Sequence, residues 1–415
     1  MKLPAQRLLG AGLLSVAICT VVLALTGLSL SRVYQPTAEG ASASLQTMSN
    51  AYKALQAFHY WLAFFAVLTS GLTIFGMLWY GWWRSARGLW WSALALGLLV
   101  YGAQVTGKPL PLTQHDARTM LTEARIAGSA PGLGPAAKDW ILPGGTVNDG
   151  SLGRWYQLHR WLTGAGSLLV SVGLLLWMWR RKMPVGGYWT LAPLALGLLL
   201  AATVGAPAGT PATHQDLRMG GPVAPMWYAV PMHALLKWSQ GLNPSLGWVG
   251  AIAIPTALAI FAFALPFLGR GKWAPVWVRG LGLFGALVVV VAFAQFGGQM
   301  QSPTSRAAPD IDTAMHSGTP GMMDSERMNE TRMRMGARLF DEQGCRNCHS
   351  LDGKGASGPG PALDGIGALK PSRSWFVSFL KDPAAQGAAL MPSYGHLSSE
   401  ELNALAEFLR AQRKQ

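Results

Sequence analysis

Long apolar runs alternate with short polar segments over the first three-quarters of the chain. Seven runs are long enough to cross a membrane as helices, because about 20 apolar residues span the hydrocarbon core. They lie at residues 8–31, 58–83, 89–107, 158–179, 188–206, 247–269 and 278–297. The first is longer than the apolar part of a signal peptide and has no Ala-x-Ala site, so we expect it to remain as a helix. The pattern predicts an all-α fold with a seven-span transmembrane helical bundle.

The apolar pattern ends near Gly298. Residues 298–325 are rich in Gly, Pro, Ser, Thr, Met and Ala, which is typical of a flexible linker. Helical periodicity over Met335–Glu342, and over Glu400–Ala411 after a capping sequence that starts at Ser398, predicts a small soluble α-helical domain. We therefore expect a membrane domain at 1–297, a linker at 298–325 and a soluble domain at 326–415.

Composition and charge support a membrane protein. The 415 residues are 50% hydrophobic and 13% charged, whereas soluble domains carry about 25% charged residues. The net charge of +14 does not indicate a nucleic-acid partner, because the basic residues form short clusters at the ends of apolar spans. These clusters are Lys2/Arg7, Arg84/Arg87, Arg180/Arg181/Lys182 and Arg270/Lys272/Arg279.

The same clusters predict the orientation. They lie at alternate ends of successive spans, so the positive-inside rule places all of them in the cytoplasm. Seven spans that start inside end outside. We expect a multi-pass protein of a bacterial inner (plasma) membrane, with the soluble domain in the periplasm or outside.

The soluble domain contains Cys345-Arg346-Asn347-Cys348-His349. Two thiols separated by two residues and followed by His are the attachment signature of a covalent c-type haem, with His349 as an axial ligand of the iron. A zinc site is less favoured, because Cys19 is the only other cysteine. Met391 follows on a later loop, where a thioether is the usual second axial ligand; otherwise it is a packed Met.

Two other residues have simpler explanations. His316 and the Met residues of the linker could be read as a copper site, but Met at such a junction is more often incidental. Cys19 lies mid-way along the first span, where we expect a small buried residue.

Two histidines mark the spans. His59 begins the second span and His159 the fourth, so both lie near the outer face at the same depth. A His inside a span is costly without a partner or a metal. Two at one depth on different helices suit a haem held between helices, whereas a lone one is more often a hydrogen-bonded structural residue.

Several motifs resemble known families. The segment Gly358–Leu363 and the later Met391-Pro392 resemble the small class I single-haem cytochromes c over residues 326–415, which implies that the Pro361 carbonyl orients His349. Four segments in the membrane domain resemble cytochrome b of bc-type quinol oxidising complexes over roughly residues 8–297. They are Thr26-Gly27 with Tyr34-Gln35-Pro36 and Glu39-Gly40-Ala41; Thr106-Gly107 with Leu110-Pro111 and Gln114; Arg154–His159; and Pro225-Met226-Trp227-Tyr228.

The resemblance implies a respiratory electron-transfer subunit with one haem b, held by His59 and His159, and one haem c. Pro225, Met226, Trp227 and Tyr228 would line an outer quinone pocket. The expected partners are a Rieske-type iron–sulfur protein or other redox subunits, and a soluble cytochrome or terminal acceptor. The chain itself has too few cysteines for an iron–sulfur cluster. A second copy of the chain, forming a homodimer, is a further possible partner.

The sequence departs from the family at the inner face. The family has a second His fourteen residues after each of the first, about 21 Å deeper at 1.5 Å per residue. Here these positions are Thr73 and Gly173. We expect no redox centre in that half of the membrane. Nearby Trp residues either help fill the space or form an ordinary belt at the membrane edge: Trp79, Trp82, Trp177 and Trp179.

The second departure is Met226, where the family has a Glu that accepts a proton from quinol; a thioether cannot do so. Any of five residues in outward loops could substitute, although each of them is more often a solvated loop residue: His115, Asp116, His214, Asp216 and His233. Two functions follow. The first is quinol oxidation at the outer face, with electrons passing through one b haem to the tethered c haem. The alternative is a quinone-independent membrane anchor and conduit for a periplasmic dehydrogenase or another cytochrome. A haem sensor would not need two haem types.

Overall fold

The computed structural model describes most of the chain. The described residues are 3–207, 209–212, 217, 225–243, 246–268, 274–296, 324–343, 345, 348–351, 360–370, 372–383, 385–386, 388, 391, 393–395 and 397–413. They form helices and, within these ranges, no β-strand. Residues 1–120, 139–218 and 256–288 make one compact unit, and residues 121–138, 219–255 and 289–415 make a second.

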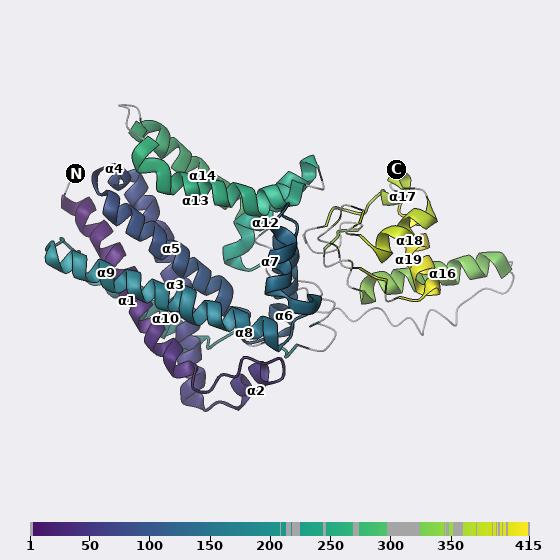
Figure 1. Ribbon diagram of the computed structural model, residues 1–415, viewed down its shortest axis with the longest axis horizontal. Coiled ribbons are helices and arrows are strands. Elements are labelled where there is room, and N and C mark those ends of the chain that lie inside the picture. Colours follow the sequence, from purple (N-terminus) through teal and green to yellow (C-terminus); the bar gives the residue numbers. More distant parts are fainter. Residues whose placement is uncertain are drawn as a thin grey trace. The chain divides into compact units, whose positions relative to one another are not determined.

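The first unit is a bundle of apolar helices that lie side by side (Figure 1). Its long members are α1 (Leu3–Leu30), α3 (Asn50–Trp79), α5 (Arg87–Gly107), α9 (Gly166–Arg180) and α10 (Ala192–Thr203). Short helices connect them: α2 (Gly40–Thr47), α4 (Trp82–Ser85), and α8 (Asp149–Gln157), which continues through a π-helical turn at Leu158–Ala165 into α9. Two further helices belong to this unit only in part. They are α6 (Gln114–Gly128), up to Met120, and α7 (Gly134–Ile141), from Asp139.

Large apolar side chains fill the centre of the bundle. Trp83, Trp90 and Met77 are completely buried there. The indole nitrogens of Trp90 and Trp91 donate to the carbonyls of Ala262 and Phe263, at 2.9 and 3.0 Å, and so tie α13 (Ile254–Leu268) to α5. A donor inside an apolar core needs such a partner, which fixes the register of the two helices.

The structure divides these Trp residues between the two expected roles. Trp82 is buried in this core, but Trp177 and Trp179 are 41% and 76% exposed on the outside of the bundle. Because Trp177 and Trp179 face outward, they suit a membrane-facing belt. The core position that sequence inspection missed is Trp90, on α5.

Among the described residues, six helices are long and apolar enough to cross a membrane, against seven predicted spans. They are Ala5–Leu30, Asn50–Trp79, Arg87–Gly107, Asp149–Arg180, Val249–Leu268 and Ala274–Gln295. The remaining expected span, 188–206, is a shorter apolar helix at Tyr188–Thr203. It packs on α3, where Gly197 lies against the backbone of Leu62.

The second unit contains α12 (Val230–Leu242) and a small helical domain. That domain consists of α16 (Asp324–Glu342), α17 (Ile366–Leu369), α18 (Arg373–Lys381) and α19 (Ser399–Ala411). Its core packs Phe340, Leu380 and Leu405 around the buried Cys345. Both predicted helices of this domain are confirmed, although α16 begins before Met335. The proposed linker and its His316 lie outside the described residues except for its last two positions.

The predicted capping sequence of α19 is also confirmed. The Ser398 hydroxyl accepts from the Glu401 amide at 3.2 Å, and the Glu401 carboxylate accepts from the Ser398 amide at 2.8 Å. Two amides at the helix start are thereby satisfied.

We expect Ser398→Ala to lower the free energy of unfolding of the soluble domain by about 1 kcal/mol, the usual cost of losing a cap. Guanidinium unfolding followed by the absorbance of the covalent haem measures it in the full chain. Ser399→Ala, one position later, is the matched control. Equal effects of the two variants would contradict the capping role.

Candidate haem sites

The two histidines of the spans face each other. His59 lies nine residues after the start of α3, and His159 ten residues after the start of α8. Their ring centres are 6.3 Å apart and their planes differ by 72°. Metal–imidazole bonds are about 2.0–2.1 Å long, so imidazoles on opposite sides of one metal have ring centres roughly 6 Å apart. The spacing fits two axial ligands of one haem iron.

A threonine from α1 fixes the ring of His59. The Thr26 hydroxyl donates to the Val22 carbonyl at 2.9 Å, so its oxygen accepts from Nδ1–H of His59 at 2.8 Å. That bond leaves Nε2 as the nitrogen with a free lone pair. Such second contacts set the tautomer and the orientation of a metal-binding imidazole.

His159 is held in the same way from α5. Its Nδ1–H donates to the Ala103 carbonyl at 3.0 Å, with the Thr106 hydroxyl 3.4 Å away. His159 sits in the π-helical turn, where Thr163 donates to the His159 carbonyl at 3.1 Å. Single π turns inside α-helices are frequent at functional sites.

A glycine follows each threonine and leaves room for the ring. A Cβ on Gly27 would lie 3.2 Å from Cε1 of His59, and one on Gly107 only 2.6 Å from Cε1 of His159. The Thr-Gly pairs at 26–27 and 106–107 therefore act alike: the threonine lies at Nδ1 and the glycine gives the imidazole space.

The two positions that the resemblance places near the inner face differ in their surroundings. Thr73 is buried against α1, where a Cβ on Gly12 would lie 2.4 Å from its hydroxyl oxygen. Gly173 is exposed, and a Cβ added there would have no heavy atom within 4 Å. One position packs against a neighbouring helix and the other faces outward.

The soluble domain brings its expected ligands onto one turn. The amides of Cys348 and His349 donate to the Cys345 carbonyl at 3.2 and 3.0 Å, which closes a helical turn with both thiols and the imidazole. Nδ1 of His349 lies 2.8 Å from the Pro361 carbonyl, as the resemblance implied. Burial lowers the pKa of His349, which favours the neutral, metal-binding imidazole.

Gly360 is the close-approach residue of this site. A Cβ there would lie 2.4 Å from Cε1 of His349. Met391 packs at the edge of the domain core, and its amide donates to the Ala388 carbonyl at 3.0 Å. These contacts fit a covalent haem held by Cys345, Cys348 and His349, with Met391 in the later loop.

The outer loop with Met226 leads into α12. Pro225 is buried, Trp227–Ala229 form a 3-10 turn, and the Ala229 amide donates to the Met226 carbonyl at 2.8 Å. The rings of Trp227 and Tyr228 meet edge to face, with centres 5.8 Å apart.

The five candidates for the missing carboxylate differ in their contacts. Asp116 is fully buried and bonded to Lys108 at 2.8 Å and to the Thr113 hydroxyl at 2.7 Å, which makes it the anchor of α6. His115 lies 3.3 Å from the Thr119 hydroxyl within the same helix. His214 and Asp216 lie outside the described residues.

His233 is the candidate with a carboxylate partner. It is buried on α12, and its Nε2 lies 3.0 Å from Glu123 Oε1 of α6. A buried imidazole paired with a half-buried carboxylate can take up a proton without leaving an isolated charge. The residue stands shortly after the Met226 loop in the sequence, but its partner Glu123 carried no sequence signal.

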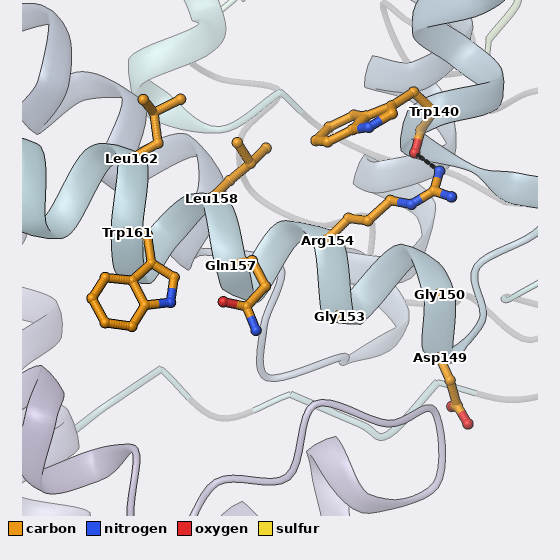
Figure 2. Close-up of a pocket in the computed structure, with 9 residues that line it drawn as sticks. All are labelled: Trp140, Asp149, Gly150, Gly153, Arg154, Gln157, Leu158, Trp161 and Leu162. Carbon is orange, nitrogen blue, oxygen red and sulfur yellow. Dashed lines mark hydrogen bonds between the residues drawn. The ribbon is translucent and has the colours of Figure 1, made fainter.

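A groove of about 410 Å³ lies along α8 (Figure 2). Arg154 reaches across it to the Trp140 carbonyl. Leu158, Trp161 and Leu162 give it apolar walls, while His159 and the loop at 225–228 do not line it. It is therefore neither the cradle of the His pair nor the expected quinone pocket.

Comparison with known proteins identifies the family of the membrane domain and of the soluble domain. Residues 62–190 match the family model cytochrome b (N-terminal)/b6/petB, and residues 331–409 match cytochrome c oxidase, cbb3-type, subunit III. Cytochrome b6 of Heliobacterium mobile is 31% identical over 159 residues, which cover 37% of this chain and 73% of that protein. The chain belongs to the cytochrome b family.

Two further similarities extend over more of the chain. Cytochrome b of Rhodobacter capsulatus is 25% identical over 305 residues, or 62% of this chain and 69% of that protein. A solved structure titled hyperthermophilic respiratory Complex III has the same fold, with a TM-score of 0.52 at 18% identity, over 71% of this chain and 90% of that one. This cytochrome b homologue is thus a membrane electron-transfer subunit with a cytochrome c domain at its C-terminal end.

The glycine beside His159 gives a direct test of the cytochrome b site. We expect Gly107→Ala to displace the imidazole and to remove most of the acid-extractable haem, while the covalent haem stays. Extraction of the purified membrane protein measures both. Gly71→Ala is the control, because a Cβ on Gly71 of α3 meets open space. Full extractable haem in Gly107→Ala would refute the assigned site.

Proposed function

We propose that this cytochrome b homologue takes electrons at the outer membrane face, from quinol or a partner redox protein, and delivers them to its own cytochrome c domain. The observation that carries the proposal is the facing pair His59 and His159, with each Nδ1 already held. One haem b between them and one haem c on Cys345 and Cys348 would each accept and release a single electron when bound. His349 and Met391 would be the axial ligands of the haem c iron.

The orientation is part of the proposal. It requires that the short α10 crosses the membrane, which a bilayer accommodates by local thinning. If α10 did not cross, the basic cluster near Arg279 would lie on the opposite side from the cluster at Arg180–Lys182, against the positive-inside rule. We infer a bacterial inner membrane with the N-terminus in the cytoplasm and the cytochrome c domain outside.

We propose that His233 accepts the proton of quinol in place of the family glutamate, with Glu123 stabilising the imidazolium. Met226 cannot serve, whereas the buried pair can. Pro225, Met226, Trp227 and Tyr228 would then form the wall of the quinone pocket. A Rieske-type protein, other redox subunits, an external cytochrome and a second copy of the chain are the partners to look for.

Quinol-driven reduction of the b haem tests this assignment. We expect His233→Gln to slow it by about a hundredfold, a typical contribution of a general base, and Glu123→Gln to slow it less. Stopped-flow absorbance with a quinol donor measures the rates. Glu342→Gln is the control, because that residue pairs with Arg338 on α16. If His233→Gln and Glu123→Gln both leave the rate unchanged, the pair does not accept the proton of quinol.

Met226 is also the observation that favours the alternative, in which no quinone is used and a periplasmic dehydrogenase or another cytochrome supplies the electrons. Wild-type protein that quinol cannot reduce, but a redox partner can, would establish that function instead.

A second expectation concerns the membrane potential. With Thr73 and Gly173 in place of ligands, we expect turnover in sealed vesicles to reduce an external acceptor without building a potential through this subunit. Moving one charge inward would cost about 2.3 kcal/mol per 100 mV. A potential-sensitive dye, with and without uncoupler, measures this. Quinone reduction at the inner face would disprove it.

A further inference from the structure

A lysine of α12 touches the cytochrome c domain within the second unit. Lys237 Nζ donates to the Gly360 carbonyl at 2.8 Å. This contact joins residues more than a hundred positions apart, in a helix next to the Met226 loop and in the haem-binding loop. Burial lowers the pKa of Lys237 to about 8, so the side chain remains mostly an ammonium at neutral pH.

The loop that Lys237 contacts lies against His349, the proposed axial ligand. The Gly360 amide donates to the Cys348 carbonyl at 2.8 Å, and the next carbonyl, of Pro361, lies 2.8 Å from Nδ1 of His349. Lys237 is thus one residue away from the contact that orients the imidazole. A charge-assisted bond of a half-buried lysine is among the stronger hydrogen bonds, and losing the acceptor would leave the charge poorly solvated.

The contact also lies beside the proposed proton site. Lys237 is one turn beyond His233 on α12, and His233 pairs with Glu123 of α6 at 3.0 Å.

We propose that Lys237 forms a cationic seat on α12 that holds the cytochrome c domain by its haem-binding loop. Lys237 is a positioning residue: it fixes the loop of Gly360 and Pro361 and keeps the Cys348–His349 edge of the domain on the helices that carry the His233–Glu123 pair. The seat makes the cytochrome c domain of this chain a docked electron acceptor. Electrons could then reach it without a mobile iron–sulfur carrier.

The inference rests on the proposed function in one respect, since it assumes that electrons reach the cytochrome c domain from the membrane domain. The seat has two measurable consequences in the full-length protein. It should speed electron transfer from the b haem to the c haem. Its positive charge should also stabilise the reduced haem c, because reduction adds a negative charge, and so raise the c-haem potential.

Lys237→Met keeps the side-chain length and removes the charge. We expect it to slow reduction of the c haem by the reduced b haem at least fivefold and to shift the c-haem potential downward, with b-haem reduction unchanged. Lys237→Arg should restore both. Lys370→Met is the control, because Lys370 is exposed on the same domain and lies over Trp375. Single-turnover absorbance and redox titration of c give the two readouts.

Unchanged transfer and potential in Lys237→Met would overturn the seat, and faster transfer would show instead that the contact restrains the domain. Failure of the proposed function is distinct, because wild-type protein would then lack transfer from b to c altogether.

Discussion

Four helices of the bundle meet at two imidazoles, His59 and His159, whose ring centres lie 6.3 Å apart, a spacing that fits the two axial ligands of one metal. Each ring comes from one helix and is oriented by another: α1 fixes His59 through Thr26, and α5 fixes His159 through Ala103 and Thr106. The adjacent glycines give each ring its space. The packing of four helices is therefore tied to one cofactor site, and a change in any of the four is felt at the imidazoles.

The bundle differs from the family at the positions expected to lie near the inner face. Where the family resemblance places a second pair of ligands, Thr73 packs on Gly12 and Gly173 faces outward. Large side chains such as Trp83 and Trp90 fill the core. Burial of this apolar surface stabilises the bundle by about 25 cal/mol per Å². The proposed single haem b site would leave electrons an outward path to the cytochrome c domain.

Sequence patterns predicted the main elements but not their limits. Hydropathy located the spans, and Cys345–His349 located the covalent site, because both are local signals. Hydropathy did not show that α3 begins at Asn50, since its first turns are polar. It also missed that α10 is short. The partners of His59, His159 and His233 come from distant segments, and a Thr-Gly pair or a single Glu carries no signal of such a contact. The His349–Pro361 contact was reached only through family resemblance.

A potentiometric titration of the b-haem absorbance in purified full-length protein tests the single-site bundle most directly. We expect one one-electron component, with an amplitude that corresponds to one b haem for each covalent haem. Two components of equal amplitude would show a second redox centre in the inner half of the bundle and would contradict the outward-only path.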